Sequence, residues 1–191
     1  VLRTGRAAEQ ERDVVKRLGN RIFIASCAAA LIVSGAATAT SGELEINFAD
    51  AAWNGETIPA GQQCKKDGGK GSTPGLQISG LPEGTVKILM AIRDKDARYQ
   101  PMRTNGGHGI IGFEHAGGDK AMLVAVPGGT KKGLPPGTWI ERKNKAGGAW
   151  SSAGYLPPCS GGAGNMYLAE LSAVDSRGKK LSQATLELGK Y

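Results

Sequence analysis

The chain has 191 residues, with 24 Lys and Arg against 17 Asp and Glu, and a formal net charge of +7 at pH 7. Its basic residues occur in small pairs such as Lys65-Lys66 and Lys131-Lys132, without a long basic stripe interleaved with aromatics, so a nucleic-acid-binding protein is not indicated. With two histidines and no His-x-x-x-His or Cys-x-x-Cys spacing, the composition also argues against a catalytic zinc site.

The N-terminal segment has the pattern of an export signal. Basic residues between positions 16 and 21 precede an apolar run at 22–33, and Ala-Thr-Ala at 37–39 fits the small-x-small cleavage rule. The run is shorter than the roughly 20 residues that a transmembrane helix needs. We therefore predict an N-terminal extension and signal peptide at 1–39 and one periplasmic or secreted domain at 40–191. An uncleaved anchor or a buried segment is the alternative.

Beyond the signal, the pattern indicates short β-strands. Leu44, Ile46 and Phe48 alternate with polar residues, as in a half-buried strand, and the almost continuously apolar run 86–92 predicts a buried strand. Further candidates are 110–113, 121–126, 138–141, 167–174 and 185–188. The chain has 30 glycines, a density that favours turns between short strands, and the mature chain shows no long apolar period of 3.6. We expect an all-β antiparallel sandwich of the Greek-key type, with long glycine-rich loops and little helix.

Polar residues stand at the ends of two of these strands. Asp94 and Asp96 follow the run 86–92, and His108 opens the run 110–113 after a link that is rich in turn-forming residues. Loops held by a rigid sheet are where binding groups usually lie. The two acidic residues and the histidine are therefore expected to converge on one small pocket.

The chain has two cysteines beyond the predicted signal. Removal of 1–39 takes away Cys27, lowers the net charge from +7 to +4 and leaves Cys64 and Cys159. In an oxidising compartment such a pair can form a disulfide, with two free thiols as the alternative. A free Cys159 near His108 would make a thiol nucleophile pair, a hypothesis that a disulfide would exclude.

The order of these motifs resembles the phosphatidylethanolamine-binding protein (PEBP) family, which includes Raf kinase inhibitor-like proteins and bacterial relatives. That family carries D-P-D-A-P after a central strand, then a histidine, then G-Y-x-G-P-C-P-P and H-R-Y. Five elements occur here in the same order between 58 and 175: TPGLQI at 73–78 with PEGT at 82–85, DKDA at 94–97, His108, GYLPPC at 154–159 and NMY at 165–167.

The resemblance implies a β-sandwich with a small pocket that accepts phosphate-like anions, including phospholipid headgroups. The positions that it assigns to ligand binding are Asp94, Asp96, His108, Tyr155, Pro158, Asn165 and Tyr167. Arg98, which departs from the family motif, is a further candidate because of its charge. Imidazole, phenol and backbone N–H groups together suit a phosphate, and Asp94 is expected to orient His108 and favour its protonated form. The resemblance also implies that Cys64 and Cys159 meet; the disulfide would stabilise the fold by roughly 4 to 5 kcal/mol in the chain-entropy model.

The chain departs from the family pattern inside the expected pocket. Lys95 and Arg98 replace the two prolines of D-P-D-A-P, Gly109 replaces an aromatic residue, and Asn165 replaces a second histidine. Since Asn cannot become cationic, one titratable imidazole remains, and Arg98 is expected to restore the lost charge. Each candidate also has a plainer reading: the aspartates as turn caps, the histidine as structural, and the tyrosines and tryptophans as packing residues.

These observations favour a binding protein without enzymatic activity, cofactor or metal. The expected partner is a phosphate-bearing small molecule or lipid headgroup; nucleic acid is not expected. The alternative is a protein-interaction regulator, similar to a protease or kinase inhibitor, that docks a protein partner at the pocket rim. An exported chain favours targets outside the cytoplasm. The sequence leaves open whether the protein forms a homodimer.

Overall fold

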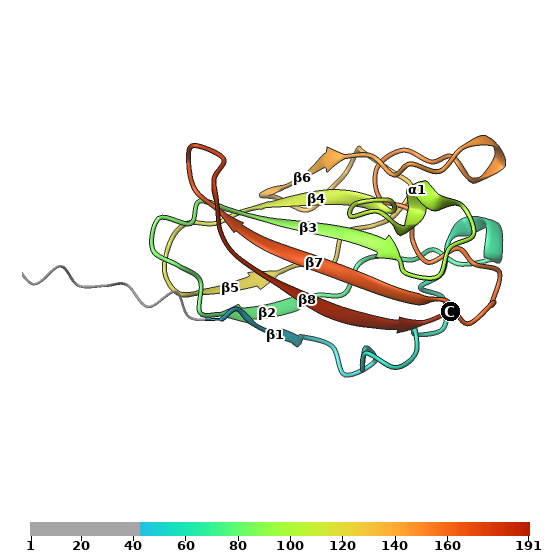
Figure 1. Cartoon of the computed structure of the whole chain (residues 1–191), viewed down its shortest axis with the longest axis horizontal. Helices are drawn as coiled ribbons and strands as arrows, with labels where there is room; N and C mark the ends of the chain where they lie inside the picture. Colours follow the sequence, from blue (N-terminus) through green and yellow to red (C-terminus); the bar gives the residue numbers. More distant parts are fainter. Residues whose placement is uncertain (1–42) are drawn as a thin grey trace, which may run out of the picture. The chain divides into compact units, whose positions relative to one another are not determined.

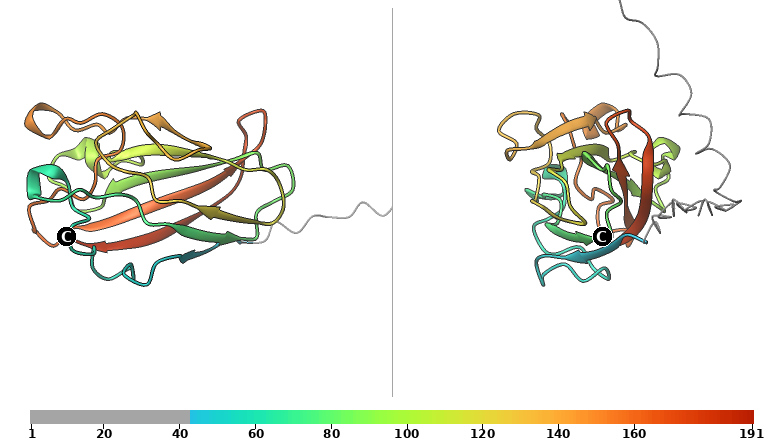
Figure 2. Two further views of the ribbon diagram at one scale, coloured as in Figure 1. Left: turned by 180° about the vertical axis from the view of Figure 1, so that it is seen from behind. Right: turned by 90° about the vertical axis from the view of Figure 1, so that its left-hand side faces the viewer.

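The computed structural model describes residues 43–191, so the predicted signal peptide and its cleavage site lie outside the described part. Two antiparallel sheets make up this part (Figure 1). The smaller sheet has the order β1 (Glu45–Phe48), β2 (Leu76–Ser79), β5 (Lys120–Leu123). The larger has the order β6 (Thr138–Arg142), β4 (Gly109–Glu114), β3 (Lys87–Asp94), β7 (Met166–Val174), β8 (Lys180–Lys190). The predicted all-β sandwich is confirmed, and Figure 2 shows its two sheets from behind and from one end.

Strand patterning explains how the sheets pack. In β1 the exposed Glu45 and Asn47 alternate with the half-buried Ile46 and Phe48, which confirms the period predicted from the sequence. The central strand β3 carries fully buried side chains that face the smaller sheet, including Ile88, Met90 and Ile92. Each such side chain contributes about 1.5 to 3 kcal/mol of burial free energy relative to exposure. The core thus holds β3 rigidly, and with it the residues at its end.

Some strand boundaries differ from the prediction. The strand β2 was not predicted, because a four-residue run with two apolar side chains gives a weak periodic signal. The strand β8 spans Lys180–Lys190 and is longer than predicted, since its polar N-terminal half pairs with β7 from an edge of the sheet. The strand β5 ends earlier than predicted, at Leu123.

Helical structure is limited in the described residues. The helix α1 (Gln100–Arg103) lies in the link between β3 and β4, where only turns were predicted, and Pro101 stands in its first turn. Two 3-10 turns, η1 (Lys65–Asp67) and η2 (Gly148–Trp150), complete the helical segments. Between residues 43 and 191, none of the helices has the length and apolarity required to cross a bilayer.

A disulfide joins Cys64 to Cys159, residues 95 positions apart, with their Cα atoms 5.3 Å from each other. This confirms the predicted pairing, and it excludes Cys159 as a thiol nucleophile while the bond is intact. Asp67 lies beside the two sulfur atoms, but sulfurs joined in a disulfide are not thiolate metal ligands. The bond belongs to a second hydrophobic cluster, which also contains Ala97, Met102 and Leu156.

Candidate ligand-binding cavity

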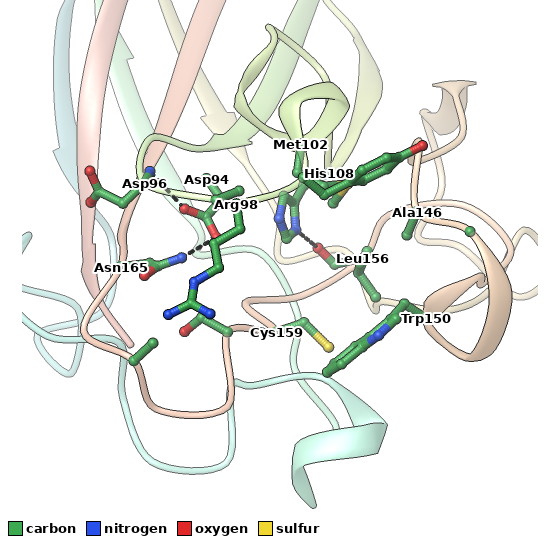
Figure 3. A pocket seen from close by; sticks show the side chains of 15 residues that line it. Asp94, Asp96, Arg98, Met102, His108, Ala146, Trp150, Leu156, Cys159 and Asn165 are labelled. Atoms are coloured by element: carbon green, nitrogen blue, oxygen red, sulfur yellow. Dashed lines mark hydrogen bonds between the residues drawn. The ribbon is translucent and has the colours of Figure 1, made fainter.

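A cavity of about 870 Å³ lies where β3 ends and where β4 and β7 begin. It has a polar end and an apolar end, with His108 between them (Figure 3). We call Asp94, Asp96, Arg98 and Asn165 the polar end, and Met102, Ala146, Leu156 and Trp150 the apolar end. Five of the residues predicted for the site line the cavity, namely the four of the polar end and His108.

The two carboxylates of the polar end join the end of β3 to the start of β7. Asp94 is 4% exposed; its Oδ1 accepts the backbone N–H of Asp96 at 2.9 Å, and its Oδ2 accepts the side-chain amide of Asn165 at 2.8 Å. Asp96 in turn accepts the backbone N–H of Met166 at 2.9 Å. Asp94 therefore caps a turn, as in the plainer reading, and lines the cavity as well.

His108 is held on three sides by hydrogen bonds. Its backbone N–H donates to the carbonyl of Ile92 at 2.9 Å, and its own carbonyl accepts the N–H of Leu156 at 2.8 Å. The ring Nδ1 lies 2.8 Å from the Leu156 carbonyl oxygen. Because a carbonyl oxygen only accepts, Nδ1 carries a proton, and in the neutral ring Nε2 is an acceptor. Among the described residues, the ring hydrogen bond of normal length and angle is the one made by Nδ1, and the Pro157 backbone lies close enough to the ring to raise its pKa slightly.

Burial sets the protonation of this ring. His108 is 2% exposed, and the loss of hydration lowers its pKa below the ordinary value of 6.5. The hydrogen bond to Leu156 and the charge of Asp94 raise the pKa, but by less. The charge of Asp94 thus favours the imidazolium, as expected, but burial outweighs it, and the expectation that Asp94 orients the ring was wrong. The oxygens of Asp94 accept other donors, the carbonyl of Leu156 orients the ring, and burial outweighs the carboxylate's charge.

Tyr155, Tyr167 and Pro158 do not line the cavity. Tyr155 is fully buried in the core, and its hydroxyl has no partner among the described residues; burial raises its pKa. Tyr167 accepts the backbone N–H of Cys159 at 3.0 Å, and burial followed by the charge of Asp94 raises its pKa. Pro158 accepts the N–H of Cys64 at 2.8 Å. The structure therefore places these three residues outside the cavity lining, and the ligand contacts implied for them stay a prediction.

The sequence interpretation missed the apolar end of the cavity. Leu156 stands inside the GYLPPC motif, and Met102 lies in the link that was predicted to form only turns. Trp150 was interpreted as a packing residue, yet it is 38% exposed, lies at the cavity, and has the Lys66 ammonium 3.1 Å from its ring centre. Tyr99, 57% exposed, also contributes to the rim. No local pattern marks these positions, because they come from separate loops.

Comparison with known structures identifies the fold. No family model matches the sequence, and a search of curated proteins gave no significant match. E. coli YbcL, described as a member of the mammalian PEBP family, is 20% identical, with a TM-score of 0.52 over 78% of this chain and 98% of its own. A putative PEBP homologue from Chlamydia trachomatis is 18% identical, with a TM-score of 0.48 over 79% of this chain and 98% of its own. On the likeness to YbcL, this chain has the PEBP fold.

Proposed function

We propose that this protein is an exported, non-catalytic binding protein of the PEBP type that holds a phosphate-bearing small molecule or lipid headgroup in the cavity. The observation that carries this proposal is the convergence of Asp94, Asp96, Arg98, His108 and Asn165 on one cavity at the strand ends. The export pattern of the N-terminus and the disulfide between Cys64 and Cys159 agree with an oxidising compartment.

The polar end offers partners for both charges of a zwitterionic headgroup. Arg98 supplies guanidinium donors for a phosphate, and the exposed carboxylate of Asp96 accepts hydrogen bonds from an ammonium group. His108 responds to the ligand through Nε2. A bound anion stabilises the imidazolium, so Nε2 takes up a proton and donates it in a hydrogen bond to a phosphate oxygen. Phosphate binding is therefore expected to tighten as the pH falls.

The test follows the ring resonances of His108 by NMR while the full chain is titrated with phosphoethanolamine. His115, at the other end of β4, is the internal control because it does not line the cavity. We expect a saturable shift and a raised pKa at His108 alone. If neither ring responds at millimolar ligand, the proposed headgroup site is rejected.

A second candidate function is protein-interaction regulation, similar to a protease or kinase inhibitor. It is favoured by the exposed aromatic side chains of Tyr99 and Trp150 at the rim, since aromatic residues are enriched in protein interfaces. In that case Tyr99→Ala would weaken binding of the protein partner while the His108 titration with phosphoethanolamine stayed silent. Capture of a partner from the extracytoplasmic fraction, compared between the wild type and Tyr99→Ala, would separate the two functions.

A further inference from the structure

The cavity is larger than a headgroup requires. Its volume of about 870 Å³ lies near the top of the roughly 300–1,000 Å³ range of pockets that enclose drug-sized ligands. A phosphate paired with Arg98 and His108 would occupy the polar end and the boundary. Met102 and Leu156 are already more than nine-tenths buried by the protein. A phosphate alone would nevertheless leave the space in front of them, at the apolar end, filled with water.

The apolar end is a built part of the fold. Met102 comes from α1, Ala146 from the loop after β6, and Leu156 from the segment that the disulfide anchors at Cys159. Met102 and Leu156 belong to one hydrophobic cluster with Ala146 packed against it. Since α1, the loop after β6 and the Cys159 segment all contribute apolar side chains that pack together, this end presents a continuous apolar wall.

Trp150 closes the apolar end at the rim. Figure 3 shows its ring across from Ala146 and beside Leu156. The ammonium of Lys66 lies 3.1 Å from the centre of the ring, a cation–π contact that fixes the indole in place. The wall and the rim thus form a slot for a compact apolar group, with the polar end at a fixed position on the far side of His108.

We propose that the ligand is a monomeric amphiphile: a phosphate head at the polar end, carrying one alkyl or aromatic group that inserts into the apolar end. This inference rests on the proposed function and adds the class of ligand. The apolar group enters the protein as part of the ligand, in contrast to a headgroup recognised while its tails remain in a bilayer. Affinity then increases with the apolar group until the slot is full.

The test is a calorimetric titration of the full chain with inorganic phosphate, propyl phosphate and hexyl phosphate. Each methylene that becomes fully buried tightens binding by up to about fourfold. Three methylenes give a ceiling of about sixtyfold, so hexyl phosphate is expected to bind roughly tenfold to sixtyfold more tightly than propyl phosphate. It is also expected to shift the fluorescence of the wild type but not of Trp150→Phe. Equal affinity for all three compounds would overturn this inference and leave the headgroup site intact. Absence of binding by all three would overturn both.

A variant locates the apolar group. Ala146→Phe fills the slot, so the ratio of hexyl phosphate to inorganic phosphate affinity is expected to fall to about one. Ala116→Phe is the matched control, because Ala116 is exposed beyond the other end of β4. Met102→Gln, nearly equal in size, tests the same wall should Ala146→Phe lose its thermal transition. An unchanged affinity ratio in both folded variants contradicts the proposed slot.

Discussion

The two histidines of the chain flank the same strand and have different surroundings. His108 precedes β4 and is 2% exposed, with its ring hydrogen-bonded to Leu156, 48 residues away. His115 follows β4, and its Nε2 pairs with the carbonyl of Gly118, three residues away, at the surface. One ring is therefore held by tertiary structure and the other by its own turn, so the residue type alone does not indicate a functional histidine.

The two ends of the sandwich also differ in whether long-range or local contacts hold them. At the His108 end, the disulfide brings the loop of Cys159 over the strand ends and closes a cavity. At the His115 end, a hollow of about 490 Å³ is lined by turns that include Glu83 and Asp119. The buried polar side chain among its lining residues is Thr85, whose hydroxyl donates to the Pro82 carbonyl only three residues away. Long-range links thus distinguish the candidate site from an ordinary surface depression.

The largest expected effect comes from cutting the main long-range link. The double variant Cys64→Ala/Cys159→Ala should lower the free energy of unfolding by about 2 to 5 kcal/mol, because the disulfide no longer restricts the unfolded chain. Urea unfolding of the wild type with and without reductant provides the comparison. Hydrogen exchange should speed up around His108 and stay unchanged around His115. Equal acceleration at both ends would show that the disulfide does not stabilise the cavity end selectively.

A glycine near each histidine allows a matched backbone test. Gly109 has φ of +120°, and a Cβ there would lie 3.2 Å from the Cα of Tyr155, whereas Gly117 has φ of +105° with open space around it. Both substitutions to alanine force an unfavourable φ, but only Gly109→Ala adds a contact with fixed backbone. We expect losses of about 2 to 3 kcal/mol for Gly109→Ala and about 1 kcal/mol for Gly117→Ala, measured by urea unfolding. Similar losses for both variants would show that the Tyr155 backbone beside Gly109 shifts easily to make room for the added Cβ.

The lowered pKa of His108 predicts a pH dependence of stability. Below about pH 6.5 the His108 ring takes up a proton more readily in the unfolded chain than in the folded protein. The contribution of the neutral, buried ring to the free energy of unfolding is therefore complete above about pH 6.5. It is lost as the pH falls from that value toward the lower folded pKa. His108→Asn, which keeps a donor for the Leu156 carbonyl, should flatten the slope of unfolding free energy against pH in this window, while His115→Asn should not. Urea unfolding at several pH values tests both variants, and identical slopes would contradict the burial argument.

The smallest expected effect concerns Arg98, which is expected to restore the charge lost where Asn165 replaces the family's second histidine. Arg98 lines the cavity but is exposed, so its interaction with a phosphate is screened by solvent. Arg98→Ala should weaken phosphoethanolamine binding by up to about fivefold, corresponding to at most about 1 kcal/mol. Arg103→Ala, an exposed arginine that does not line the cavity, is the control of equal charge. An equal effect of both variants would indicate general electrostatic attraction without a specific contact.

The sequence by itself determined the features that depend on neighbouring residues. Alternation in β1 and the apolar run of β3 predicted strands, because side-chain direction along a strand has a period of two. The same reasoning placed Asp94 and His108 at adjoining strand ends, where the structure has them. The pairing of Cys64 with Cys159 was implied by the family resemblance, not by local pattern.

Only the tertiary structure decided the chemistry of the cavity. The protonation of His108 depends on burial and on a carbonyl 48 residues away, and the apolar end combines Met102 from α1 with Ala146 and Leu156 from two separate loops. Tyr155 and Tyr167 lie in the core because the sheets close around them, although the motif implied ligand contact. Desolvation and shared walls arise from segments far apart in the chain, so no local pattern in the sequence records them.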